Sequence, residues 1–130
     1  MSGTRQYQAA QAPLFRLNAA NMQSTADQSF TKLGTFTNYI ITKVVAVNKT
    51  GGTSVACVGG IYTAAAKGGS ALVAAAQSWL NLTALGKIVD GTIAAVVGTD
   101  IQTATPILSL TTGSTAASTA DILIFGQVLD

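Results

Sequence analysis

The side chains that usually carry catalysis or hold metal ions are scarce in this chain of 130 residues. It contains no His, and all five of its acidic residues are Asp. Without an imidazole, neither a Ser-His-Asp triad nor a Cys-His pair can form, and His ligation of zinc is excluded. A single cysteine, Cys57, excludes an intramolecular disulfide and every CxxC metal motif. The five carboxylates are widely spaced in sequence, which argues against a catalytic carboxylate pair: Asp27, Asp90, Asp100, Asp121 and Asp130.

The remaining motif candidates are better explained by structure than by chemistry. Gly86-Lys87 looks like the end of a phosphate-binding loop, but Ile88 replaces the Ser or Thr that such a loop needs. Asp90-Gly91 is typical of a type I′ hairpin turn. Trp79 could stack on a sugar ring, although a lone Trp among leucines is more often a core side chain. The sequence therefore predicts no enzymatic activity and no catalytic, cofactor-binding or metal site.

The low charge of the chain restricts the kinds of partner that we expect it to bind. Charged residues make up 9% of the chain, against about 25% in a typical globular domain. The net charge is +2 and the cations are spread along the sequence, which argues against a nucleic-acid groove. No apolar run reaches the roughly 20 residues of a membrane helix, and residues 1–28 contain no stretch typical of a signal peptide. We therefore expect a protein that is made in a cytoplasm and binds neither nucleic acid nor membrane.

Residues 29–130 are predicted to form one β-rich body. Short β-prone segments alternate there with Gly, Asn, Asp and Ser. The clearest is 38–47, in which Tyr39, Ile41 and Val45 fall on one face, and the opposite face is also largely apolar. This pattern predicts a strand that is covered on both sides. Strands at this spacing indicate an all-β fold, either an antiparallel β-sandwich or a jelly roll.

One short helix is predicted within this body. The segment 68–78 is rich in Ala, the best helix former, and Ser70 can cap its first turn. Leu72 and Val73 would supply the apolar side of the helix. We therefore expect a short helix near residues 70–78, packed on the sheet.

Residues 1–28 are predicted to be an N-terminal arm, because they show no sustained period of 2 or 3.6 residues. Leu14, Phe15 and Leu17 form a small apolar cluster within it. One interpretation is a flexible terminus, which is common. The other is an arm that docks on a neighbouring subunit through these three side chains, since a disordered tail normally avoids Phe and Leu. The sequence leaves both interpretations open.

The order of segments in the body resembles a known family. A β-rich run, IITKVVAVNKTGGTSVACVGGIYTA, is followed by SALVAA and then by WLNLT. A TIAAVVGTDI segment and a small-residue loop then lead into ADILIFGQVLD. This order, over about residues 29–130, is similar to that of the small β-sandwich decoration (cement) proteins on the capsids of tailed bacteriophages.

The resemblance implies a structural virion protein, made in the host cytoplasm, that binds the outer capsid surface and stabilises the shell. Its partners would be the major capsid protein and further copies of itself, as a dimer or trimer, and no cofactor is implied. Small side chains lose little entropy on burial, and many copies multiply a modest affinity, which suits such a lattice.

Alternatives remain open at this point. The chain could be another virion component, such as a head fibre base or a tail or connector subunit, or a non-viral adhesin. It could also be a carbohydrate-binding β-sandwich module. That module would need an exposed aromatic platform, which only four residues could supply: Tyr7, Tyr39, Tyr62 and Trp79.

Overall fold

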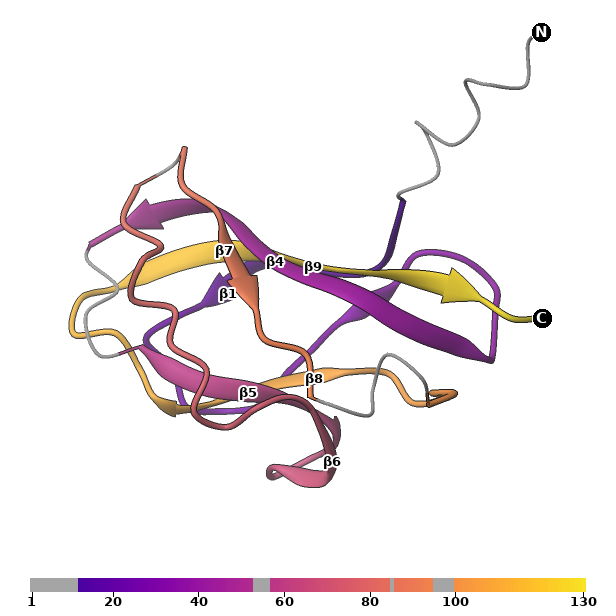
Figure 1. The fold of residues 1–130 in the computed structure, drawn as a ribbon. Coiled ribbons are helices and arrows are strands. Elements are labelled where there is room, and N and C mark those ends of the chain that lie inside the picture. Colours follow the sequence, from indigo (N-terminus) through magenta and orange to yellow (C-terminus); the bar gives the residue numbers. More distant parts are fainter. Residues whose placement is uncertain (1–11, 53–56, 85, 95–99) are drawn as a thin grey trace, which may run out of the picture.

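Two antiparallel β-sheets lie one above the other in the computed structural model of the protein (Figure 1). The structure describes residues 12–52, 57–84, 86–94 and 100–130. These ranges contain strands and no helix. In chain order the strands are β1 (Pro13–Asn21), β2 (Gln28–Ser29), β3 (Thr31–Lys32), β4 (Tyr39–Gly51), β5 (Val58–Ala64), β6 (Gly68–Val73), β7 (Val89–Gly91), β8 (Ile107–Thr112) and β9 (Ser118–Val128).

The two sheets have five and four strands. The five-stranded sheet has the order β3-β1-β9-β4-β7, and the four-stranded sheet has the order β2-β8-β5-β6. In Figure 1 the long strands β4 and β9 run side by side in one layer, with β5 and β8 in the other. Strands β2 and β3 flank Phe30, so the chain passes there from one sheet to the other. The predicted all-β fold, with two antiparallel sheets, is confirmed.

The core lies between the two sheets and contains the only tryptophan. Trp79 is fully buried, and its indole Nε1 donates a hydrogen bond of 3.1 Å to the Gly59 carbonyl. This confirms the interpretation of Trp79 as a core side chain. Nearby, the rings of Phe15, Phe36 and Tyr39 meet edge to face, with centroids 5.0–5.7 Å apart. Such ring contacts add to the stabilisation from buried apolar area.

A bulge in β4 decides which of its side chains face the core. Tyr39 and Ile41 point inward as predicted and are fully buried. The register against β9 then shifts between Ile41 and Lys43, so that Val44 faces the core and Val45 faces outward. The predicted faces are therefore wrong beyond Ile41, because a bulge inserts one extra residue and reverses the alternation that follows.

The predicted helix near residues 70–78 is not formed. Gly68–Val73 is strand β6, which pairs with β5, and the chain then turns at residues 74–76. Leu72 and Val73 are buried in the core from this strand. Tertiary pairing has overridden the helix propensity of Ala, which is a weak preference per residue. The segment 65–69 favours this outcome, because it makes a tight turn with positive φ at three residues: Ala66, Lys67 and Gly69.

The predicted boundary at residue 28 is also wrong, because the described part of the predicted arm belongs to the five-stranded sheet. Pro13–Asn21 is strand β1, which pairs along most of its length with β9. Its register shifts twice, between Pro13 and Phe15 and between Leu17 and Ala20. These shifts erase the two-residue period in the sequence, which is why local alternation does not predict the strand. Residues 1–11 lie outside the described residues.

The structure also differs from the sequence pattern in two shorter segments. Within residues 30–36, a β-prone segment of the sequence, only Thr31–Lys32 forms a strand, β3, and residues 33–38 are not in a strand. The turn expected at Asp90-Gly91 is instead part of β7, where Asp90 pairs with Val45 of β4. A Cβ atom at Gly91 would lie 3.2 Å from Val44 Cγ1 and 3.4 Å from the Trp79 ring. Close approach to the core, not positive φ, therefore accounts for this glycine.

Replacing Gly59 by Ala should destabilise the protein strongly. A Cβ atom there would lie 2.3 Å from Leu110 Cα on the paired strand β8. We expect a loss of about 2–3 kcal/mol in the free energy of unfolding, measured by urea denaturation. Gly86→Ala is the matched control, because nothing lies within 4 Å of the added atom. Equal stability of the two variants would contradict the strand contact.

Phe15→Ala tests whether β1 belongs to the core. The buried ring packs on Phe36 and Tyr39, so its removal should cost about 3–5 kcal/mol in the free energy of unfolding. Leu33→Ala serves as the control, since Leu33 is 44% exposed and should cost little. A Phe15→Ala protein as stable as the original would restore the interpretation of this segment as a free arm.

Candidate functional site

The single thiol of the chain lies in the core. Cys57 is fully buried, and its Sγ donates to the Met22 carbonyl oxygen at 3.4 Å. Burial raises the pKa of Cys57 to about 11, so the group stays a thiol near neutral pH. A buried, protonated thiol is a poor nucleophile, since the thiolate is the reactive form. Cys57 therefore acts as a small apolar side chain.

A serine and a lysine meet on the outer side of the four-stranded sheet, a pair that the sequence did not predict. Lys67 Nζ donates to Ser109 Oγ at 3.1 Å. The Asp27 carboxylate accepts the Ala66 N–H at 2.8 Å, and this bond, the Ser109 hydroxyl and the Lys67 charge lower the Asp27 pKa. Ser109 is only 1% exposed, so a substrate cannot reach its hydroxyl. The group instead fixes the turn between β5 and β6.

Asp121 lies on the outer side of the five-stranded sheet and joins two bulges. Its Oδ1 accepts the Ala19 N–H of β1 at 2.8 Å, and its Oδ2 accepts the Asn48 amide of β4 at 3.0 Å. Arg16 Nη2 lies 3.7 Å from the same Oδ2. Both Ala19 and Asn48 have positive φ, which is uncommon for residues other than Gly. Asp121 therefore holds two strained backbone positions in place.

The described residues do not support binding of a metal ion or a sugar. Across the ranges that the structure describes, no three Cys or Asp side chains cluster closely enough to hold a metal ion. Trp79, Tyr39 and Tyr62 are buried, so none of these rings is free to stack on a sugar. Burial raises the pKa of Tyr39 to about 12, and its hydroxyl donates to the Ala104 carbonyl. Tyr7, the fourth candidate, lies outside the described residues.

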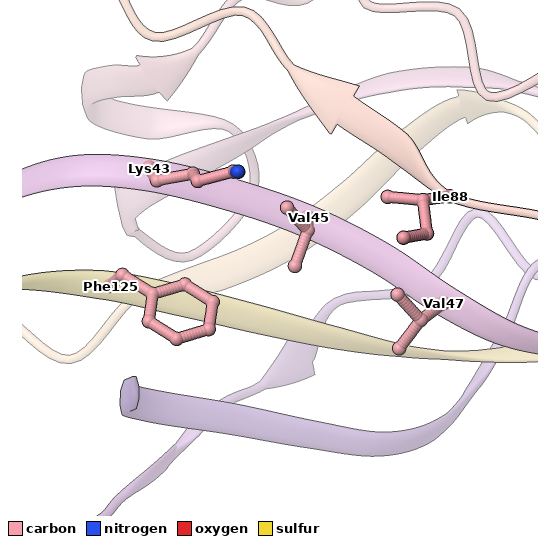
Figure 2. Close-up of a pocket in the computed structure, with 5 residues that line it drawn as sticks. All are labelled: Lys43, Val45, Val47, Ile88 and Phe125. Carbon is pink, nitrogen blue, oxygen red and sulfur yellow. The ribbon is translucent and has the colours of Figure 1, made fainter. Parts of the chain in front are cut away.

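An apolar depression of about 260 Å³ lies on the outer face of the five-stranded sheet (Figure 2). We call it the outer patch, and five residues line it: Lys43, Val45, Val47, Ile88 and Phe125. Its side chains come from β4 and β9 and from the residue before β7. Ile88 is 65% exposed, and Lys43 supplies the single charge. Strand β4, which was predicted to be covered on both sides, therefore has the core on one side and this apolar depression on the other.

A second group of exposed apolar side chains gathers where β9 ends and β4 begins. We call it the end surface, and it comprises Ile101, Val128 and Leu129, three of the six exposed large apolar residues described. Tyr39 pairs with Val128 on one side, and on the other its N–H donates to the carbonyl of Gln102, next to Ile101. The Leu129 N–H donates to the Asn38 carbonyl at 2.9 Å. Strand pairing therefore places the backbones of all three residues beside the start of β4.

The three predicted docking residues lie elsewhere. Leu14 and Phe15 are buried in the core of their own chain, and Leu17 is partly buried and packs against that core. They come from one strand, β1, and their place in the sheet accounts for the apolar cluster seen in the sequence. The exposed surfaces come instead from residues distant in sequence, so no local pattern marked them.

Comparison with known proteins gives no relative. No family model, no curated protein and no solved structure matches the chain. In the part of the chain that the structure describes, no helix is long and apolar enough to cross a membrane. The functional argument therefore rests on the two exposed apolar surfaces.

Asp121→Asn should destabilise the protein in a pH-dependent way. Partial burial raises the pKa of Asp121, but the Ala19 N–H, the Asn48 amide and the Arg16 charge more than offset this and lower it. A lowered pKa stabilises the fold above the ordinary carboxyl pKa of about 3.9, and this contribution is lost as the pH falls through the folded-state value.

We expect the Asn variant to lose about 1–2 kcal/mol of unfolding free energy at pH 7, since its side chain keeps one acceptor oxygen for two donors, the Ala19 N–H and the Asn48 amide. The difference from the original protein should shrink below about pH 4, where Asp121 itself becomes protonated. Urea denaturation at a series of pH values measures it. A difference that is constant from pH 7 to pH 2 would contradict a role for the charge.

Proposed function

We propose that this chain is a structural virion protein that binds the outer surface of a tailed-phage capsid as a decoration, or cement, protein and stabilises the shell. In this proposal it acts as a homo-oligomer on the virion surface, after synthesis in the host cytoplasm. It has no enzymatic activity, and its sandwich has jelly-roll connectivity. Membership of this family is supported by the segment order of the body, which runs from the β-rich run at residue 40 to ADILIFGQVLD.

The end surface is the observation that carries the proposal. Single exposed apolar side chains are normal on proteins, but a group of them marks an interaction site. Ile101 is 63% and Leu129 is 42% exposed, and backbone pairing places both residues, like Val128, beside the start of β4. Asp130 follows Leu129, and its carboxylate accepts hydrogen bonds from the Thr37 and Asn38 N–H groups. This surface fits an apolar contact with a flat protein partner, which we assign to the major capsid protein.

The composition supports the same assignment. The chain carries few long charged side chains, so little side-chain entropy is lost when its surface is covered. Each contact can be weak, because a lattice multiplies the affinity of many linked copies. A head fibre base or a tail or connector subunit would share these properties, and its position in the particle distinguishes it. The buried state of Trp79 and Tyr62 gives no support to a carbohydrate-binding module.

Shell binding is tested by changing the end surface. Purified shells that lack this protein are mixed with the full chain, and the bound fraction is measured by sedimentation. We expect Ile101→Ser with Leu129→Ser to weaken binding about tenfold or more, since each buried apolar side chain contributes about 1.5–3 kcal/mol. Leu80→Ser is the control, because Leu80 is 45% exposed and lies outside both surfaces.

Each result of this sedimentation assay bears on a different part of the proposal. Retained folding with lost shell binding supports the end surface as the capsid contact. Equal loss in the Leu80→Ser control would point to a general effect of lower hydropathy and would contradict the assignment. A protein that never sediments with shells, and is absent from purified particles by mass spectrometry, would overturn the function itself.

A further inference from the structure

A single row of side chains crosses the outer face of the five-stranded sheet. Arg16 of β1 pairs with Leu123 of β9, Leu123 pairs with Val45 of β4, and Val45 pairs with Asp90 of β7. Paired residues in neighbouring strands share a face, so these four side chains lie on one side. Their inward neighbours confirm the side, since Val89 and Ile124 are buried. The row is basic at one end, apolar in the middle and acidic at the other end.

This row is complementary to itself. The two charges are three strand spacings apart, which is about 14 Å. A second copy, related by a two-fold axis parallel to the strands and midway between β9 and β4, would place its Asp90 over Arg16 and its Arg16 over Asp90. The same rotation places Leu123 over Val45 in both directions. An isologous interface requires this kind of self-complementary patch.

The adjacent rows fit the same rotation. Lys43 pairs with Phe125, so the rotation sets each ammonium over the ring of the other copy, a favourable cation–π arrangement. Asp121 pairs with Val47 in the row on the other side. Its carboxylate already accepts bonds from the Ala19 N–H and the Asn48 amide and lies near Arg16. Covering Asp121 in the interface therefore leaves no unpaired charge. Every charged side chain of these rows then faces an opposite charge or an aromatic ring.

We propose that two copies of this chain dimerise through the outer face of the five-stranded sheet, around a two-fold axis parallel to its strands. The outer patch then closes against its own copy: apolar side chains fill the centre, and two Arg16–Asp90 pairs fix the register. The inference deepens the proposed function, which needs a homo-oligomer, and the outer patch shares no residue with the end surface. The charge order of the row identifies the occupant as a second copy.

Charge reversal with rescue tests the interface. The dissociation constant of the full chain is measured by sedimentation equilibrium, without shells. Asp90→Arg creates two pairs of positive charges across the interface, and Arg16→Glu creates two pairs of negative charges. We expect each single variant to weaken the dimer about tenfold or more, since like charges in an interface are strongly unfavourable. The double variant should bind more tightly than either single variant, because the pairs re-form with exchanged charges, although the acid at position 16 no longer favours Asp121 within its own chain.

Two controls separate this interface from general effects. Asp100→Arg makes the same change in net charge outside the rows and should leave the dimer unchanged. Ile88→Ser removes an exposed side chain of the outer patch and should weaken the dimer, while Leu80→Ser should not. Urea denaturation checks that each variant is folded.

A full chain that stays monomeric at all concentrations overturns the interface, as does a double variant that is no better than the single ones. A monomer whose shell binding is lost in Ile88→Ser would assign this face to the capsid protein and would equally overturn the dimer. Because the readout is solution mass, failure of the dimer leaves the shell assay to decide the proposed function separately.

Discussion

The pairing of β9 with both β1 and β4 is the interaction on which the rest of the structure depends. β9 is the last strand in the sequence, and it lies between two strands from the first half of the chain. Its inward side chains Ile122 and Ile124 are fully buried, so it supplies the centre of one core face. The five-stranded sheet therefore cannot close before the C-terminal strand is present. Such non-local pairing slows folding, because long loops must close before the strands can pair.

The bulges beside β9 determine which side chains reach solvent. The shift after Ile41 turns Val45 outward, and the later shift in β4 creates the positive φ of Asn48. The matching shift in β1 places Ala19 opposite, and Asp121 of β9 bridges the two. Outward-facing apolar residues and a fixed carboxylate are thus consequences of the same irregularities. A regular sheet with the predicted alternation would have put Val45 in the core.

The two exposed apolar surfaces have different places in the sandwich. The outer patch lies on a broad sheet face, whereas the end surface lies where β9 ends. A protein that coats a shell needs one contact with its own copies and another with the lattice. The outer patch has charges of both signs around it, which suits a register-specific contact with itself. The end surface offers exposed apolar side chains, which suit adhesion that many copies reinforce.

The fold class and part of the core follow from the local sequence. Its short β-prone segments with Gly and Asn between them predicted an antiparallel all-β fold, and its lone Trp79 was expected in the core. The missing His and Glu excluded whole classes of chemistry, because no fold can supply an absent side chain. These conclusions depend on composition and local alternation, which the chain carries without reference to its partners in space.

Only the tertiary structure decided where the irregular segments belong. β1 has no local period, since its two register shifts break the alternation, and its place is set by pairing with β9 about one hundred residues later. Gly68–Val73 has the composition of a helix but pairs with β5, because backbone hydrogen bonds to that strand and burial in the core outweigh a weak propensity. The row from Arg16 to Asp90 joins four strands, so its charge order exists only once the sheet has set their register.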